Sequence, residues 1–147
     1  MIGALNGTEN FLEDFLEKGI SNEQLTMREY FSSIGYDLGV DYYFRVPRSY
    51  SRRGIFSIDE PCQTIRGVDR PIPPGYPGHP ADPVELGPNV KALSIQERAY
   101  VQTFPLGFKF EGNKTNLNQM IGNAVPVNLA KYVANALREY ISTRERI

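Results

Sequence analysis

The sequence predicts an α+β protein, in which a small mixed region of short strands and Pro-rich loops is accompanied by helices. Three observations lead to this fold class. Apolar residues recur at helical spacing near both ends of the chain. Aromatic and β-branched residues alternate with arginines over residues 40–70, which is typical of short strands. Residues 71–83 hold six prolines in thirteen positions, and proline removes backbone donors, so this segment is expected to be a loop.

Two helices are expected in the first part of the chain. The first lies within residues 1–20 and ends at Gly19, with an apolar stripe formed by Phe11, Leu12, Phe15 and Leu16. The second begins at Thr26, because Thr26 and Glu29 have the spacing of a capping box, and it ends at Gly35. Its inward-facing residues are expected to be Met27, Tyr30, Phe31 and Ile34.

The strands are expected between residues 40 and 70, ahead of the Pro-rich loop. Their aromatic and β-branched positions are Tyr42, Tyr43, Phe44, Ile55, Phe56, Ile58, Ile65 and Val68. A second capping box, Ser94 to Glu97, predicts a helix that ends before Phe104. Pro126 suits the first turn of a last helix. The 3.6-residue repeat of that helix consists of Leu129, Tyr132, Val133, Ala136, Leu137, Tyr140 and Ile141.

Composition limits the classes of function. The chain has 147 residues, the length of one domain, and its formal net charge of −1 predicts no overall attraction to nucleic acid or membrane. The only cysteine cannot form an intrachain disulfide, and no metal site is indicated, since His79, the only histidine, is expected in a loop. The apolar runs are too short to span a membrane, and without a secretory signal pattern we expect a cytoplasmic protein.

Arginines concentrate in one part of the chain despite the overall negative charge. Residues 45–53 contain Arg45, Arg48, Arg52 and Arg53 and no acidic residue, and Arg66 and Arg70 follow in a hairpin-like stretch. Guanidinium groups bind phosphate oxygens and the edge of guanine, and neighbouring aromatic rings can stack on bases. These arginines are therefore candidate DNA-binding residues. The alternative is a solvated, arginine-rich surface with no ligand.

Residues 117–137 combine a Gly-Asn turn with the start of an amphipathic helix. Backbone amides at a helix N-terminus bind carboxylates and phosphates, and the side chain of Asn123 could add hydrogen bonds. The turn is therefore a second candidate binding site. The alternative is a helix cap that only packs against its neighbours.

Two segments near the C-terminal end resemble the last two conserved motifs of the cytosine-5 DNA methyltransferases. The ninth motif of that family runs Leu-Thr-x-Arg-Glu, then a helix, then Phe-Pro, and Leu93 to Glu97 with Phe104-Pro105 is similar to it. The tenth is Gly-Asn-(Ser/Ala)-Val before a long helix, similar to residues 122–125. Upstream, residues 61–65 resemble the Pro-x-x-Thr-Ile step of the target recognition domain. The resemblance covers nearly the whole chain.

This sequence departs from the family pattern at two positions in the ninth motif. Ser94 replaces the common threonine but keeps its capping chemistry. Gln96 stands where the family usually has arginine, so a charge that could help to fix the recognition domain to the catalytic core is absent.

Pro61-Cys62-Gln63 matches the tripeptide around the nucleophilic cysteine of the same family. Its position argues against that role, because the catalytic Pro-Cys-Gln of the family precedes the whole recognition domain, whereas here Thr64-Ile65 follows at once. We therefore interpret Cys62 as a variable residue of the recognition step and expect no catalytic residue in this chain. Glu9-Asn10-Phe11 is a second coincidental match, to the Glu-Asn-Val motif.

The resemblance implies a division of labour. Residues 1–90 would be the target recognition region, with 40–90 reading double-stranded DNA and Thr64 holding its backbone, whereas 91–147 would dock on the catalytic domain. Asn123 and Ala124 would form one wall of a pocket for S-adenosylmethionine, whose methyl group passes to C5 of cytosine after a thiolate attacks C6. No Phe-x-Gly-x-Gly or Gln-x-Arg-x-Arg occurs, so the Rossmann-like core is expected in a separate catalytic chain or an N-terminal half.

Two other interpretations stay open at this point. The chain could be a stand-alone DNA-binding or regulatory module derived from such an enzyme, although a pure binder would not need the Asn123 turn. It could also be an inactive remnant. A neighbouring chain with the missing Pro-Cys-Gln and Phe-x-Gly-x-Gly motifs would favour a split enzyme over both.

Overall fold

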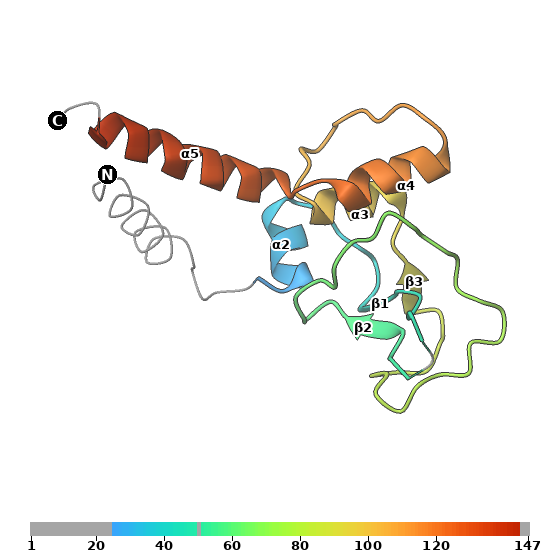
Figure 1. The fold of residues 1–147 in the computed structure, drawn as a ribbon. Helices are drawn as coiled ribbons and strands as arrows, with labels where there is room; N and C mark the ends of the chain where they lie inside the picture. Colours follow the sequence, from blue (N-terminus) through green and yellow to red (C-terminus); the bar gives the residue numbers. More distant parts are fainter. Residues whose placement is uncertain (1–24, 50, 145–147) are drawn as a thin grey trace, which may run out of the picture. The chain divides into compact units, whose positions relative to one another are not determined.

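The computed structural model describes residues 25–49 and 51–144, and its contacts divide the chain into two units (Figure 1). One unit comprises residues 25–127, with a small sheet and three helices. The other comprises residues 1–24 and 128–147, of which the described part is most of helix α5. The helix predicted within residues 1–20 lies outside the described residues. The expected mixture of helices and short strands is present.

The sheet has three short strands in the order β2-β1-β3. Strand β1 (Tyr42–Phe44) pairs antiparallel with β2 (Ile55–Ser57) and parallel with β3 (Val90–Ala92). The first two strands lie where the sequence predicts strands. Strand β3 was not predicted, because three residues show no periodicity and a parallel pair is made between distant segments.

Both faces of this sheet are covered, so successive residues of one strand enter different cores. Tyr43 packs with Phe56, the two rings stacked at 5.6 Å between centroids, in a core that also holds Met27 and Phe31 of helix α2. The other core is centred on Phe44, Ile55 and Val90, against residues of the Pro-rich loop. The alternation of side chains along a strand explains this two-sided burial.

Helix α2 (Met27–Ser33) confirms the first capping box. The Thr26 hydroxyl accepts a hydrogen bond from the Glu29 amide, and the Glu29 carboxylate accepts one from the Thr26 amide. The amides of Met27 and Arg28 donate to the carbonyls of Glu60 and Ile58, so the start of the helix is also tied to the chain that leaves β2. Met27 and Phe31 are buried as expected, whereas Tyr30 and Ile34 are half-buried.

The segment between β2 and the Pro-rich loop corrects one prediction. Residues 59–70 form no strand, and Val68, expected within a strand, is 66% exposed. Within the described part of the chain, no backbone–backbone hydrogen bond involves residues 61–72. The apolar residues of this segment are explained without a strand, because Cys62 and Ile65 each pack against the core from an irregular backbone.

The Pro-rich loop is irregular, as predicted, and Asp82 fastens it to the sheet. One carboxylate oxygen accepts hydrogen bonds from the amides of Gly54 (3.0 Å) and Ile55 (3.1 Å). The other accepts from the Tyr76 hydroxyl (2.7 Å) and the His79 amide (2.9 Å). Burial alone would raise the pKa of the Asp82 carboxyl, but these four hydrogen bonds outweigh it and hold the pKa below its usual value.

Replacing Asp82 with asparagine is expected to lower the free energy of unfolding by about 2 kcal/mol at pH 7, since an amide cannot accept at both ends. The folded-state pKa lies below the unfolded-state value of about 3.9, so the stabilisation is present above that value and is lost as pH falls through the folded pKa. Urea unfolding at several pH values measures this. The exposed Asp37, which accepts one local hydrogen bond, supplies the control Asp37→Asn. An equal loss in both variants, or a loss that does not diminish as pH falls below the unfolded-state pKa, would contradict the prediction.

Helix α3 (Ile95–Val101) confirms the second capping box and ends before Phe104 as expected. Glu97 is buried and accepts hydrogen bonds from Lys91, Tyr36 and the Ser94 amide. The helix closes with the amide of Thr103 bonded to the Tyr100 carbonyl and that of Phe104 bonded to the Ala99 carbonyl. This closure puts Thr103 at a φ of 58°, a left-handed conformation that a β-branched residue rarely adopts.

Helix α4 (Lys114–Asn123) lies beside α3 and was not predicted (Figure 1). Its sequence is rich in asparagine and has no strong apolar stripe, and the residues that fix it are Asn118 and Ile121, which are buried. Asn113 caps its start by accepting from the Asn116 amide. The Gly-Asn pair therefore ends a helix, where the sequence suggested the approach to the next one.

Helix α5 (Val127–Arg144) matches the last predicted helix and begins directly after Pro126. None of its residues is buried. Of the predicted apolar repeat, Leu129, Leu137 and Ile141 are exposed, whereas Val133 and Ala136 are half-buried. The helix thus has a regular apolar stripe that the described residues leave largely uncovered.

Candidate nucleic-acid interface

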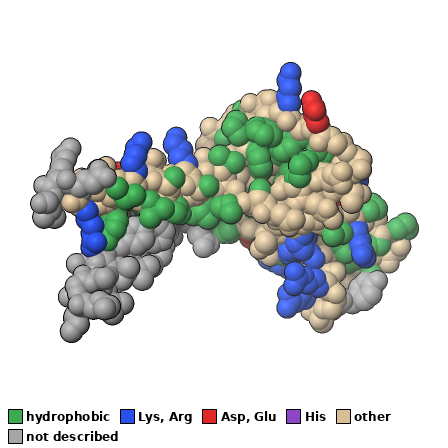
Figure 2. Space-filling model, turned by 45° about the horizontal axis from the view of Figure 1, so that its top comes forward, with side chains coloured by type: hydrophobic (Ala, Val, Ile, Leu, Met, Phe, Trp, Pro, Cys, Tyr) green, Lys and Arg blue, Asp and Glu red, His purple; other side chains and the backbone are tan. Residues whose placement is uncertain are grey.

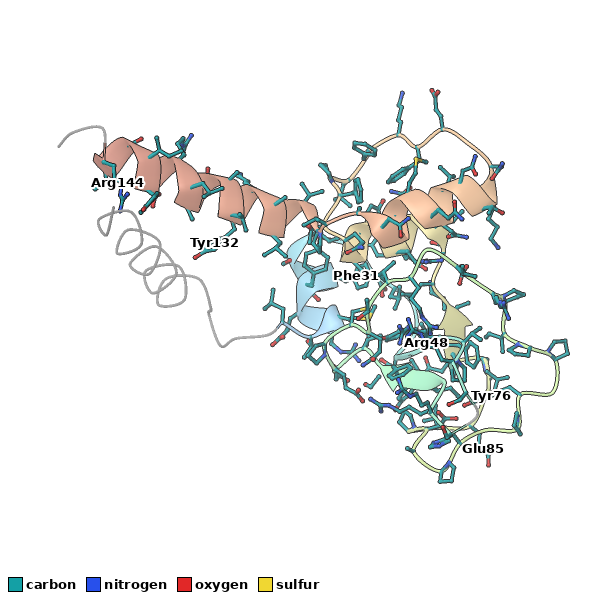
Figure 3. All side chains as sticks on the ribbon, in the orientation of Figure 1. Phe31, Arg48, Tyr76, Glu85, Tyr132 and Arg144 are labelled. Carbon is teal, nitrogen blue, oxygen red and sulfur yellow. The ribbon has the colours of Figure 1, made fainter. Side chains whose placement is uncertain are left out.

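A groove of about 640 Å³ brings together most of the residues that the sequence singled out. Its walls come from the end of β1 and the chain that follows, from the irregular residues 63–70, and from the end of α4. The candidate residues among its lining are Arg45, Arg48, Thr64, Arg66, Arg70 and Asn123. We call this feature the arginine groove. Basic side chains gather on the corresponding unit in Figure 2, and Arg48 lies beside the sheet in Figure 3.

The arginine groove carries a local positive charge although the chain as a whole is slightly negative. Among the described residues that line it, five are arginines and Asp69 is the one acidic residue. Asp69 contacts the buried Arg98 at 3.5 Å, whereas no ion pair between described residues involves the other four arginines. Clustered cations without acidic partners attract polyanions. The arrangement is therefore suited to a phosphate backbone.

Two of these arginines are partly withdrawn from water. Burial lowers the pKa of Arg45, and the nearby charges of Arg48 and Arg52 act in the same direction. Burial likewise lowers the pKa of Arg66, again with Arg45 and Arg48 contributing. Arginine stays protonated at neutral pH in spite of such shifts. The mutual repulsion shows that the cluster would gain from a bound anion.

Arg66 is held at both ends, whereas other lining residues project freely. Its guanidinium donates to the Val46 carbonyl at 2.6 Å, and its own backbone carbonyl accepts from Arg98. Thr64, Val68 and Arg70 are exposed. Val68 was expected inside a strand; in the groove its apolar side chain is available to a ligand, such as the methyl group of a thymine.

Arg52 and Arg53 do not line the arginine groove. The Arg53 guanidinium forms an ion pair with Glu60 and lies over the Phe56 ring, 4.4 Å from its centroid, so its donors are used within the protein. Arg52 is exposed and close enough to affect the pKa of Arg45. The six arginines of the sequence prediction thus divide into four groove residues and two peripheral ones.

The structure gives Asn123 and Ala124 unequal hydrogen-bonding capacity. Ala124 caps the end of α4: its amide donates to the Ile121 carbonyl at 3.3 Å, and its carbonyl accepts from the Gln102 side chain at 3.2 Å. Gln102 also donates to the Ile121 carbonyl and accepts from the Val127 amide, so it clamps this turn. Asn123 is exposed at the edge of the arginine groove. Of the two, Asn123 has the polar groups to offer to a cofactor.

Gly122 explains why glycine precedes that asparagine. A Cβ atom placed on Gly122 would lie 2.1 Å from the Gly67 nitrogen and 2.2 Å from the Arg66 carbonyl carbon. Atoms that are not bonded to each other do not approach so closely, and both neighbours belong to the backbone. Helix α4 therefore touches residues 66–67 directly, which joins the arginine groove to the turn at Asn123.

Arg98 is a residue of this region that the sequence did not single out. It is 4% exposed, and its guanidinium donates to Asn118 at 2.8 Å and to the Arg66 carbonyl. The sequence gives little sign of this role, because the partners of Arg98 lie 20 and 32 residues away and no local pattern around Arg98 indicates them.

Cys62 lies next to the arginine groove in an environment that disfavours the thiolate. Its sulfur contacts the Gln63 carbonyl at 3.2 Å, and burial raises the pKa of the thiol to about 11. Tyr43 and Arg45 lower that pKa in part. The thiolate is the nucleophilic form of cysteine, and this thiol is protonated at neutral pH.

Residues 25–49 and 51–144 contain no group of three or more His, Cys, Asp or Glu side chains that could hold a metal ion. In the same residues, no helix has the length and apolar character needed to cross a membrane.

Comparison with known proteins identifies the family. The model of the C-5 cytosine-specific DNA methylase family matches residues 21–139, most of the chain. The chain belongs to this family. No solved structure matches it.

The relatives of this DNA methylase chain are type II methyltransferases. It is 55% identical over 139 residues to M.HindV of Haemophilus influenzae, covering 93% of this chain and 44% of that protein. It is 47% identical over 142 residues to M.HgiDI of Herpetosiphon aurantiacus, covering 97% of this chain and 45% of that protein. M.Sau96I of Staphylococcus aureus is 38% identical over 95 residues, 65% of this chain and 20% of its own length. The chain thus spans less than half the length of these relatives.

Proposed function

We propose that this chain is the C-terminal part of a DNA (cytosine-5)-methyltransferase of a restriction–modification system. It supplies DNA recognition and one wall of the pocket for S-adenosylmethionine. The observation that carries the proposal is the arginine groove, in which four arginines that form no ion pair with a described acidic residue lie beside Asn123 of the family's last motif. The order of motifs along the chain supports its assignment to the C-terminal end, and its coverage of 44–45% of two relatives supports a larger or split enzyme.

Within the arginine groove, Arg45, Arg48, Arg66 and Arg70 would bind the phosphate backbone and base edges of double-stranded DNA, and Thr64 would accept or donate one further hydrogen bond to a phosphate. Arg52 extends the positive field from the side. Arg53 would act indirectly, because its ion pair with Glu60 is made within the protein. Charged groups of this kind bring DNA to the groove and hold its register.

The S-adenosylmethionine pocket would be shared between this chain and the catalytic part. Asn123 has an exposed amide side chain that can hydrogen-bond to a polar group of the cofactor. The backbone groups of Ala124 are already hydrogen-bonded, so Ala124 would contribute only van der Waals contact to the pocket wall. S-adenosylmethionine, when bound, supplies the methyl group. The role of this chain is to hold one side of the cofactor and to keep the turn rigid through Gln102.

Exposed apolar surface supports a partner that completes the enzyme. Phe104, Phe108 and Phe110 form a cluster of three rings with centroids 4.8–5.2 Å apart, and Phe108 is 47% exposed. Leu106 is 53% exposed in the same loop. In the other unit, the described residues leave the apolar stripe of α5 largely uncovered. Exposed apolar surface of this kind marks interaction sites. The catalytic domain, on a separate chain or an N-terminal half, is the partner we propose for it.

The purified 147-residue chain is expected to transfer no methyl group from labelled S-adenosylmethionine to duplex DNA. Adding the part of M.HindV that this chain does not cover should restore transfer, because that part would bring the nucleophile and the core of the cofactor pocket. Incorporation of label into DNA is the measurement, and Cys62→Ser is the matched variant.

Three outcomes of that assay would count against the proposal. Transfer by the chain alone that survives Cys62→Ser would contradict a missing nucleophile. Transfer that Cys62→Ser abolishes in a folded protein would make Cys62 the nucleophile. If no catalytic part restores activity while DNA still binds, the chain is a stand-alone binding module.

A further inference from the structure

Residues 61–72 bear two groove arginines but lack the support of regular structure. No backbone–backbone hydrogen bond between described residues involves them, so their position depends on side-chain anchors. The Gln63 amide donates to the Tyr43 hydroxyl at 3.0 Å, which fixes the start of the segment. Beyond it, the backbone of residues 66–67 rests on Gly122 of α4. Something must also hold the segment from the side of α3.

Arg98 is placed to be that anchor. Its guanidinium binds three partners on two parts of the chain: the Arg66 carbonyl, the Asp69 carboxylate at 3.5 Å and the Asn118 side-chain oxygen at 2.8 Å. The first two belong to residues 61–72, which we call the recognition segment, and the third belongs to α4. A planar guanidinium presents several donors in a fixed fork, which an ammonium group cannot do.

Because Arg98 is buried, we interpret its role as fixing the position of residues 66–69 and not as adding to the stability of the folded chain. Its side chain is 5% exposed, and taking a guanidinium out of water costs free energy that its partners only partly return. A well-packed apolar side chain would often stabilise the same site as well or better. An apolar residue, however, could not bind the Arg66 carbonyl and the Asp69 carboxylate and so fix their positions.

We infer that Arg98 is a positioning residue for DNA recognition: it holds residues 66–69 against α3 and α4 so that Arg66 and Arg70 face the arginine groove. This inference rests on the proposed function of the groove. It extends that function by naming a buried residue, outside the candidate DNA-binding set, that controls base discrimination. The same anchor keeps Gly67 on Gly122, so the groove and the Asn123 turn are held as one unit.

The single cysteine allows the position of the segment to be measured without DNA. Cys62 is half-buried four residues before Arg66 and packs against the core beneath the segment, so we expect its rate of reaction with a thiol reagent to rise when the segment is displaced. Arg98→Lys keeps the charge but loses the fork. We expect the thiol of Arg98→Lys to react at least about tenfold faster than that of the wild type under native conditions. Local opening of the segment sets how often the reagent reaches the thiol, and loss of the anchor lowers the free energy of that opening.

Arg28→Lys is the matched control for this substitution. Arg28 also bonds two carboxylates, those of Asp41 and Asp59, but it lies on α2 and does not line the groove. Its variant should react at the wild-type rate. Urea unfolding of both variants shows whether a faster reaction exceeds what the change in overall stability explains. If Arg98→Lys does not fold, Asn118→Ala replaces it, since it removes one partner of the guanidinium only.

Base discrimination is the second measurement, made with the chain joined to its catalytic part. A duplex is selected from a randomised pool with the wild type, and its affinity is compared with that of duplexes changed at single base pairs. We expect Arg98→Lys to reduce this discrimination by about tenfold, as a displaced bidentate contact would, while binding to unselected DNA is kept. Wild-type thiol reactivity and wild-type discrimination in Arg98→Lys would overturn the inference. If the wild type binds no duplex DNA, the proposed function fails, and the thiol rate alone decides whether Arg98 positions the segment.

Discussion

Gly122→Ala is expected to lower the free energy of unfolding of this chain by about 3 kcal/mol or more. The added methyl group would lie 2.1–2.4 Å from the backbone of Arg66 and Gly67, and backbone atoms cannot turn aside as a flexible side chain can. Overpacking of this kind costs typically 1–3 kcal/mol and sometimes more. In an unobstructed helix the same substitution would instead stabilise by up to about 1 kcal/mol, so the sign of the effect is informative.

Urea unfolding followed by far-ultraviolet circular dichroism measures the effect of Gly122→Ala. Gly87→Ala is the matched control, because Gly87 is exposed and an added Cβ there would meet nothing closer than the Glu85 carbonyl at 3.9 Å. We expect the control to be near neutral. Gly122→Ala should also speed the reaction of the Cys62 thiol, because the recognition segment must move to make room. A neutral or stabilising Gly122→Ala would show that α4 and residues 66–67 are not in contact in solution.

Local chemistry explains which helices could be predicted from the sequence. The capping boxes at Thr26 and Ser94 are each complete within four residues, and both helices begin where those residues place them. The start of α5 follows from Pro126 and a regular apolar repeat. Helix α4 lacks such a signal, since the buried Asn118 is fixed by Arg98, a residue of another helix. Strand β3 depends on pairing with β1, about 48 residues earlier, which no local pattern encodes.

The candidate site, like the fold, could be predicted from the sequence only in part. Arginine content and the family resemblance selected residues of which Arg45, Arg48, Arg66 and Arg70 share one groove. The sequence did not separate these from Arg53, because the ion pair with Glu60 depends on how the chain turns after β2. It also could not reveal the supports of the groove. The contacts of Gly122 with Gly67 and of Arg98 with Arg66 join segments far apart in the chain.

Removal of the groove arginines is expected to abolish most of the affinity for DNA. Arg45, Arg48, Arg66 and Arg70 line the groove and form no ion pair within residues 25–49 and 51–144, so a phosphate bound there displaces none of the ion pairs of this part of the chain. Each phosphate contact contributes a slope of roughly −0.9 to the logarithm of the binding constant against the logarithm of salt concentration. A contact to a guanine edge contributes about 1–3 kcal/mol of discrimination instead. Single alanine variants should therefore divide into those that flatten the salt dependence and those that relax specificity.

We expect Arg66→Ala in the first group, because one of its nitrogens is already bonded to the Val46 carbonyl and Thr64, the other candidate phosphate contact, lines the same groove. Equilibrium binding to specific and scrambled duplexes at several salt concentrations is the measurement, in the assembled enzyme. Lys109 and Lys114 are exposed and lie outside the groove, so Lys109→Ala and Lys114→Ala remove the same charge elsewhere. Arg53→Ala should reduce stability through Glu60 and leave the salt slope unchanged. If the groove variants and the lysine controls weaken DNA binding equally, the attraction is a property of overall charge, and the recognition surface lies elsewhere on the chain.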